Sequence, residues 1–173
     1  ITHGIVEEVG LAKKWLPNFQ VVEYLRAFLS GRVAWAAWNA LLVISGAFGV
    51  FKKQPVMDMA GYSTETVGED MELVVRLHQN LRKQKRSYRI HFIPDPVCWT
   101  EVPHQWRTLA RQRNRWQRGL GQALYRHLRM FANPKYGSIG MVAMPYFFLV
   151  ELLSPAVELF GYALFGIALY LGV

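Results

Sequence analysis

Cysteine is almost missing from this chain of 173 residues, and several classes of protein are excluded by what the sequence lacks. Cys98 is the single cysteine, so no disulfide scaffold can form within the chain. Low-complexity polar segments are also missing, and the hydrophobic fraction of 52% is too high for a disordered chain. No secretory signal pattern opens the sequence, which begins at Ile1 in what reads as the middle of a domain. We therefore expect a fragment of a larger folded domain.

Acidic residues are scarce, and the basic excess is concentrated in one part of the chain. The sequence has 20 Lys and Arg against 12 Asp and Glu, which gives a formal net charge of +8. Between Arg76 and Arg129 there are 13 basic residues against only Asp95 and Glu101, whereas residues 136–173 contain no basic residue. Basic residues beside an apolar segment are typical of the cytosolic side of a membrane and of contact with anionic headgroups. The same charge would suit nucleic acid or the phosphates of a nucleotide-sugar.

The apolar carboxy-terminal segment predicts contact with a bilayer. Residues 136–173 carry only two charges, both glutamates, and Ser154 followed by Pro155 reads as a helix start with Ser at the N-cap. The 19 residues from Pro155 to the end are close to the roughly 20 that a membrane span needs. Residues 141–153 suit an interfacial or re-entrant helix. We expect residues 1–135 to be a cytosolic domain and residues 136–173 to be interfacial and transmembrane; the alternative is a buried helix in a soluble protein.

The upstream pattern alternates between strand-like and helix-like segments and predicts an α/β fold. Short β-branched or alternating runs indicate strands, whereas apolar residues at helical spacing indicate helices. The expected strands are Gly4–Val9, Leu41–Phe51 and Tyr88–Ile93. The expected helices are Phe19–Leu29, Glu69–Lys85 and a long one from Pro103 to about Phe131.

One candidate catalytic group lies where the helix over residues 69–85 is expected to begin. Glu69 and Asp70 follow Gly68 directly, and free N–H groups and the helix dipole stabilise the charged form of a carboxylate at such a position. A fixed carboxylate is what a general base needs to take a proton from a sugar hydroxyl. The alternative is that these acidic residues only cap the helix.

A second candidate constellation lies inside the long basic helix. Gln112, Arg115 and Trp116 are related by i+3 and i+4, so they share one face of a helix. Such a face suits a phosphorylated sugar, because Arg binds diphosphate oxygens, indole faces a sugar ring and the amide binds hydroxyls. A nucleic-acid interface and a helix on a membrane surface explain the same residues equally well.

Four segments together resemble the carboxy-terminal half of processive, membrane-embedded family 2 glycosyltransferases, the relatives of cellulose, chitin, hyaluronan and poly-N-acetylglucosamine synthases. They are Ile44–Phe51 (ISGAFGVF), Gly61-Tyr62, Val67–Leu73 (VGEDMEL) and Gln112-x-x-Arg115-Trp116. The resemblance covers nearly the whole chain. It implies the carboxy-terminal part of a GT-A domain, a Rossmann-like α/β fold, followed by interfacial and transmembrane helices.

The resemblance also implies a role for each matching residue. Asp70 corresponds to the base that deprotonates the acceptor hydroxyl, and Glu69 would support its position. Ser45 and Gly46 belong to the loop beside the acceptor, together with Ala47.

In the second motif, Gln112, Arg115 and Trp116 would line the acceptor end of the site. Trp116 would lie under the terminal sugar and Arg115 near the diphosphate.

The sequence departs from the family pattern at a few positions. The usual Thr before Glu-Asp is Gly68 here, and the Cys that cellulose synthases have in the loop is missing, which weakens a specific assignment to cellulose synthesis. The D-x-D motif that helps to hold the nucleotide and a divalent metal is missing as well. We therefore expect Mg²⁺ or Mn²⁺ to be bound by residues outside this segment, and the segment alone to be inactive.

The sequence thus predicts an inverting glycosyltransferase of the inner (plasma) membrane with a cytosolic catalytic part. It would transfer a sugar from a nucleotide-sugar, expected to be a UDP-sugar, to a growing β-linked polysaccharide. The expected partners are the donor, the glycan acceptor and the lipid bilayer, with no nucleic acid. Two alternatives remain open: a non-processive transferase that makes a lipid-linked sugar, and a non-catalytic basic protein that binds membrane or nucleic acid.

Overall fold

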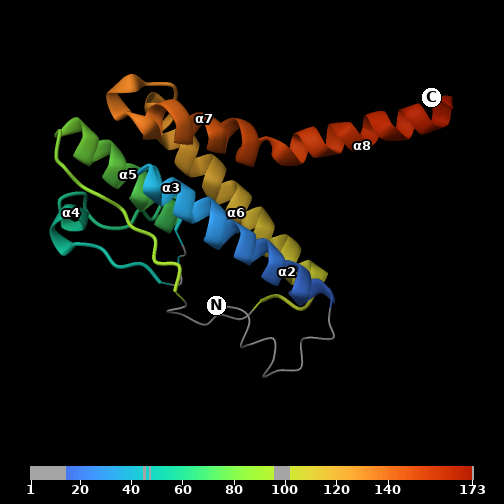
Figure 1. Ribbon diagram of the computed structural model, residues 1–173, viewed down its shortest axis with the longest axis horizontal. Coiled ribbons are helices and arrows are strands. Elements are labelled where there is room, and N and C mark those ends of the chain that lie inside the picture. The colour runs from blue at the N-terminus through green and yellow to red at the C-terminus, as the bar shows by residue number, and fades with distance from the viewer. Residues whose placement is uncertain (1–14, 45, 47, 96–101, 173) are drawn as a thin grey trace.

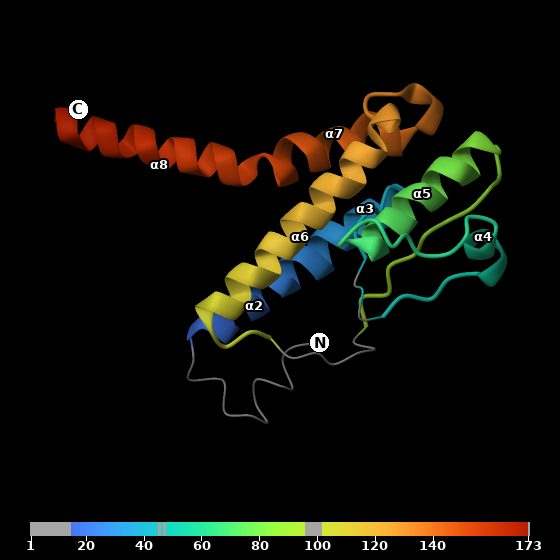
Figure 2. The same ribbon diagram turned by 180° about the vertical axis from the view of Figure 1, so that it is seen from behind.

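The computed structural model describes residues 15–44, 46, 48–95 and 102–172, and all regular secondary structure in these residues is helical. The first described element is a continuous helical rod formed by α2 (Trp15–Arg26), the π-helix η2 (Ala27–Arg32) and α3 (Val33–Ala37). This rod lies along the longest helix, α6 (Trp106–Arg126), in both views (Figures 1 and 2). The expected helix over residues 19–29 is therefore part of a longer one.

A second helical pair follows the rod in the chain. The short α4 (Lys53–Met57) packs beside α5 (Glu69–Lys83), which agrees with the helix expected from residue 69. One side of α5 is buried because its apolar residues recur at helical spacing. Acidic residues occupy its first turn and Arg82 and Lys83 its last, as the helix dipole favours.

The chain after α6 forms a helical layer and then leaves the body of the molecule. Two short 3-10 helices, η3 (Leu128–Met130) and η4 (Pro134–Tyr136), lead into η5 (Ile139–Ala143), α7 (Met144–Tyr146) and η6 (Phe147–Leu152). The final helix α8 (Ser154–Leu171) projects from this layer as an isolated rod (Figure 1). The main core lies where this layer, α5 and the end of α6 meet, and it includes Met71, Val75, Ala123, Leu124, Met130, Ile139, Met144 and Phe147.

The apolar helix α8 has the length and composition of a membrane span. None of the residues in its 18-residue apolar window is buried, and it is the one described helix that meets both criteria. Its first helical residue is Ser154, and the side chain of Ser154 donates to the carbonyl of Glu151 at 3.3 Å rather than capping the helix. The N-cap prediction for Ser154 is therefore wrong by one position, and Pro155 lies in the first turn as expected.

The α/β fold predicted from the sequence is wrong for the described residues. The described residues of the expected strands over 41–51 and 88–93 belong to no strand, and the expected strand over residues 4–9 lies outside the described part of the chain. The side chain of Asn39 explains one of these segments: its Oδ1 accepts the N–H of Ile90 at 3.0 Å, and its Nδ2 donates to the carbonyl of Tyr88 at 3.1 Å. A side chain thus satisfies backbone groups that a neighbouring strand would otherwise satisfy. A Rossmann-like sheet is not formed by these residues.

Candidate functional site

Asp70 is the carboxylate best placed for chemistry at the start of α5. Its Oδ1 accepts the backbone N–H of Met71 at 2.8 Å, and the side chain is half-buried. This bond holds one oxygen against the first turn of the helix, where free N–H groups are available. The other oxygen, Oδ2, faces the loop that contains Gly46.

The loop glycine lies close to the carboxylate of Asp70. A Cβ atom built on Gly46 would lie 2.8 Å from Asp70 Oδ2, closer than real Cβ atoms approach. A side chain at position 46 would therefore displace the Asp70 carboxylate from its present position. Ser45 and Ala47, the other expected members of this loop, lie outside the described residues.

A small cavity opens beside this contact, with a volume of about 200 Å³. Its lining residues are Ile44, Gly46, Gly49, Phe51, Tyr62, Glu69 and Asp70. Both acidic residues expected from the sequence therefore meet at one cavity with the loop glycine. Aromatic side chains of Phe51 and Tyr62 complete its wall, and a wall of this composition suits a ligand with both apolar faces and hydroxyl groups.

A half-buried cation, Arg32, acts electrostatically on the same carboxylate. Burial lowers the pKa of the Arg32 guanidinium to about 10, while the negative charge of Asp70 acts to raise it. At neutral pH Arg32 therefore remains positively charged. Arg32 comes from the π-helix η2, and nothing in the sequence pattern linked it to Asp70.

The two motif-bearing helices cross at a pair of glycines. A Cβ on Gly68 would lie 2.9 Å from the Cα of Gly119, so α5 begins in backbone contact with α6. The N–H of Val67 also donates to Gln122 Oε1 of α6 at 3.0 Å. Gly68 lies two residues before Asp70 and Gly119 three residues after Trp116, so the crossing brings both motifs to one region of the molecule.

Trp116 is held mainly by contacts with neighbouring side chains. Its ring is 42% exposed, lies 6.3 Å from the Tyr24 ring of α2, and has the Arg113 guanidinium 5.0 Å from its centre. Arg113 in turn makes two charge-assisted hydrogen bonds to the carboxylate of Glu23. Trp116 is not one of the described residues that line the cavity beside Asp70.

The other two residues of this motif differ in exposure. Gln112 Oε1 is buried without a hydrogen-bond partner among the described residues, and Arg115 is exposed. The structure thus brings Asp70, Glu69 and Gly46 together, and it places Gln112, Arg115 and Trp116 on the helix that crosses behind them.

A buried polar network supports α5 and was not predicted. Glu72 is 1% exposed; its Oε2 lies 3.0 Å from Arg76 Nη2 and its Oε1 lies 3.1 Å from His127 Nε2. Burial lowers the pKa of His127, although the hydrogen bond to Glu72 acts in the opposite direction. The i,i+4 spacing of Glu72 and Arg76 is visible in the sequence, but their burial is not.

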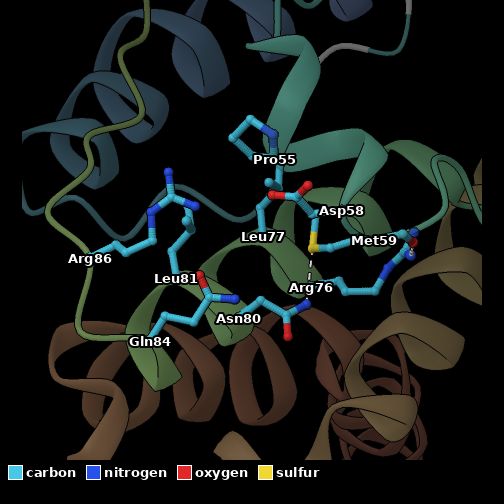
Figure 3. Close-up of a pocket in the computed structure, with 9 residues that line it drawn as sticks. All are labelled: Pro55, Asp58, Met59, Arg76, Leu77, Asn80, Leu81, Gln84 and Arg86. Atoms are coloured by element: carbon cyan, nitrogen blue, oxygen red, sulfur yellow. Dashed lines mark hydrogen bonds between the residues drawn. The ribbon is translucent and has the colours of Figure 1, made fainter.

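A second and larger cavity lies along the later turns of α5. It measures about 290 Å³ and is lined by Pro55, Asp58, Met59, Arg76, Leu77, Asn80, Leu81, Gln84 and Arg86 (Figure 3). Asp58 accepts a hydrogen bond from Gln54 at 2.7 Å. Because this cavity does not include Asp70, we do not assign the chemistry to it.

The described residues do not bring together three side chains that could hold a metal ion. Asp70 and Glu69 are the two carboxylates at the smaller cavity, and two carboxylates alone do not form the oxygen cage that a divalent metal requires. The described part of the chain therefore does not fit a resident Mg²⁺ or Mn²⁺.

Comparison with known proteins shows the family to which the chain belongs. The family model for glycosyl transferase family group 2 matches residues 1–173. The poly-β-1,6-N-acetyl-D-glucosamine synthase of Staphylococcus aureus (strain COL) is 32% identical over 111 residues, which are 64% of this chain and 26% of that protein. The probable glycosyltransferase YdaM of Bacillus subtilis (strain 168) is 27% identical over 128 residues, which are 74% of this chain and 29% of that protein.

The chain spans little more than a quarter of the length of these curated relatives. No solved structure matches it. The family model nevertheless covers the whole chain, from the segment before α2 to the end of α8, and includes both motifs. On this evidence the chain belongs to glycosyl transferase family group 2.

Proposed function

We propose that this chain carries the acceptor-activating part of an inverting glycosyltransferase that extends a β-linked polysaccharide. The observation that carries the proposal is the placement of Asp70, whose Oδ1 is held by Met71 while Oδ2 faces a cavity beside Gly46. A carboxylate that is held through one oxygen and faces a small cavity with the other is suited to general-base chemistry.

In the proposed reaction, an acceptor hydroxyl enters the cavity and donates its hydrogen bond to Asp70 Oδ2. The proton passes to this oxygen as the hydroxyl oxygen attacks the anomeric carbon of the donor sugar. The bond from that carbon to the nucleotide diphosphate breaks, and the diphosphate leaves with the bonding electrons. Attack from the opposite side of the leaving group inverts the anomeric centre.

The motif residues on α6, the helix that crosses α5 at Gly68 and Gly119, would bind the substrates. Arg115 is exposed and would bind diphosphate oxygens through its planar guanidinium. Gln112 and Trp116 would contact the glycan, and the buried Oε1 of Gln112, which has no partner in the described structure, supports a polar contact of this kind.

The proposal includes a UDP-sugar donor, a glycan acceptor and a bilayer at α8. The S. aureus relative is named for a polymer of N-acetylglucosamine, so UDP-N-acetylglucosamine is the first donor to test. The 18 residues of α8 correspond to about 27 Å at ~1.5 Å per residue, close to the hydrocarbon thickness of ~30 Å. Mg²⁺ or Mn²⁺ would take its ligands from other residues of the full-length enzyme.

The test is Asp70→Asn in the enzyme that contains this chain, purified in detergent. The amide is nearly isosteric, so donor binding and melting temperature should stay at the wild-type level. Sugar transfer should fall by roughly a hundred- to ten-thousandfold, because general-base assistance is lost. If the Asn variant keeps more than a tenth of the wild-type rate, Asp70 is only a helix-terminal residue and the proposal fails.

A further inference from the structure

We infer that Gln122 is a positioning residue that fixes Asp70 relative to the motif on α6. This inference rests on the proposed function and adds a residue that acts through the base rather than on a substrate. Gln122 Oε1 accepts the N–H of Val67 at 3.0 Å, and Val67 lies three residues before Asp70 in the chain. The side chain of Gln122 is half-buried and comes from α6, the helix that carries Arg115.

The segment that precedes α5 lies along one face of α6. Positions 119, 122 and 126 of this helix are three and four residues apart, so they share a face. Near the end of α6, Arg126 Nη1 donates to Ser63 Oγ at 3.0 Å. One turn earlier Gln122 binds Val67, and one further turn earlier the helix meets Gly68. Residues 63–68 therefore run along α6 in the direction opposite to that of the helix.

The chain reverses its direction at Gly68, where α5 begins. A Cβ on Gly68 would lie 2.9 Å from the Cα of Gly119, and Glu72 in the first turn of α5 bonds back to His127 after the end of α6. The next residue of the shared face, one turn toward the beginning of α6, is Arg115. Four residues correspond to about 6 Å at ~1.5 Å per residue, so the start of α5 lies about one turn from the position expected to bind the diphosphate.

Asp70 is thus held between two attachments to α6. The bond from Gln122 to Val67 lies before it in the chain, and the bond of 3.1 Å between Glu72 Oε1 and His127 Nε2 lies after it. The second attachment is buried, and its loss would leave polar groups unpaired in the core. Val67 is 41% exposed, so water can replace Gln122 at its N–H, and the first attachment can be removed while the fold is kept.

Loss of this attachment should reduce the rate of the chemical step. Without an acceptor on α6, the residues that lead into α5 gain freedom, and Asp70 is less often at the position that the acceptor hydroxyl requires. Misplacement of a catalytic group by about 1 Å can cost roughly a hundredfold in rate. We expect a fall of about tenfold in kcat, because the attachment through Glu72 remains, and we expect no change in either KM.

The experiment measures steady-state transfer by the full enzyme in detergent, with UDP-N-acetylglucosamine as donor and a short β-linked N-acetylglucosamine oligomer as acceptor. Gln122→Met keeps the length of the side chain without an acceptor, and it should lower kcat about tenfold with both KM values within twofold of wild type. Gln122→Ala also lacks the acceptor and should show the same fall. Gln122→Glu keeps an oxygen that can accept the N–H of Val67, so it should retain at least half of the wild-type kcat.

Gln117→Met is the matched control. Gln117 lies on the same helix, and its Nε2 donates to the carbonyl of Leu152 at 2.8 Å. This variant therefore loses a bond of the same kind, but at the end of η6 rather than before Asp70, and its kcat should stay within twofold of wild type. An equal fall of kcat in Gln117→Met and Gln122→Met overturns the inference, because any weakened attachment of α6 would then have the same effect.

A double-variant cycle with Asp70→Asn tests whether Gln122 acts through the base. The residual rate of Asp70→Asn is measured with enzyme in excess over donor. If Gln122 only positions the carboxylate, Gln122→Met should change this residual rate by less than twofold. An equal fall of about tenfold in both backgrounds overturns the inference, because Gln122 would then affect the rate without the base.

The remaining outcomes separate the failure of the inference from that of the proposed function. If transfer depends on Asp70 and kcat in Gln122→Met stays within twofold of wild type, only the role of Gln122 is overturned. Loss of folding in both Gln122→Met and Gln122→Ala, or a fall of kcat that Gln122→Glu does not restore, also overturns it, because Gln122 would then be a general structural residue. If Asp70→Asn keeps more than a tenth of the wild-type rate, the proposed function fails and the inference fails with it.

Discussion

The start of α5 and the middle of α6 carry the two motifs of the chain, yet they are built in different ways. Asp70 in α5 lies at a cavity, and the helix behind it is supported by buried polar groups such as Glu72. Trp116 in α6 packs against neighbouring side chains, and most of the arginines around it are exposed. This difference between α5 and α6 shows that a sequence motif can identify a helix near a site. The contacts in the structure are needed to tell which side chains of that helix are accessible to a ligand.

The largest effect should come from breaking the buried network of α5. Glu72→Ala removes the carboxylate that pairs with the largely buried Arg76, and it removes the hydrogen bond to His127. Loss of one member of a buried pair costs about 3–5 kcal/mol. Thermal or denaturant unfolding of the purified variant would measure it.

Glu65→Ala is the control for this change. Glu65 pairs with Arg126, but its side chain is exposed, so the loss should stay below about 1 kcal/mol. If Glu72→Ala and Glu65→Ala lower the free energy of unfolding equally, burial does not make the Glu72 network more important than the exposed pair.

Acid should weaken the same helix through His78. Burial lowers the pKa of His78 to about 4, and its ring bonds the carbonyl of Leu41 at 2.9 Å and the hydroxyl of Tyr88 at 2.6 Å. The unfolded chain, with a histidine pKa of about 6.5, takes up the proton first as pH falls. Stability is therefore present above about pH 6.5 and is lost toward pH 4, by up to about 3 kcal/mol.

Denaturant unfolding between pH 7.5 and 4 would measure this loss. His78→Phe should flatten part of the pH dependence, whereas His104→Gln should leave it unchanged, because His104 is exposed. His127 adds to the loss in the same direction, since its pKa is also lowered by burial. If His78→Phe leaves the dependence of unfolding free energy on pH unchanged, His78 is not a source of the loss of stability in acid.

The glycine crossing should respond to a single methyl group. Gly119→Ala places a Cβ 2.9 Å from the Cα of Gly68, and overpacking of this kind costs about 1–3 kcal/mol. Gly121→Ala lies on the same helix, meets its nearest atom, Leu152 Cδ1, at 3.4 Å, and should be neutral or slightly stabilising because alanine favours helix. If Gly119→Ala and Gly121→Ala lower the melting temperature equally, the close contact of Gly119 with Gly68 is not the cause of the destabilisation.

The smallest effect concerns the packing of Trp116. Trp116→Ala should cost about 1–2 kcal/mol, less than the ~3–5 kcal/mol of a fully buried tryptophan, because the ring is half-exposed against Tyr24 and Arg113. Trp116→Phe should recover most of this loss. An unchanged melting temperature with elongation abolished would instead show that the ring serves the glycan in the working enzyme.

The helices could be predicted from the sequence more closely than the extended segments. The periodicity over residues 69–85 predicted α5 to within two residues, because its apolar side and charged termini agree with one another. The long helix starts at Trp106 rather than Pro103 and ends at Arg126 rather than near residue 131. Residues 88–93 read as a strand because their alternation reports burial of alternate side chains, and no pattern could show that Asn39 binds their backbone.

The site could be predicted in part. The motif order placed Asp70, Glu69 and Gly46 in one site, and all three line the smaller cavity, whereas their roles stay a prediction. The contribution of Arg32 from η2 could not be predicted, and neither could the bond from Arg76 of α5 to the carbonyl of Gly61, because both depend on how distant segments pack.

The close approach at Gly68 has a consequence for protein engineering. Replacing an unusual residue by the one common in its family is often stabilising, and threonine is the common residue before the Glu-Asp pair in the family that this chain resembles. Here a Thr side chain would begin 2.9 Å from the backbone of Gly119 and would force the two helices apart. The consensus substitution should therefore move Asp70 away from its cavity, and any library built on this chain should leave position 68 as it is.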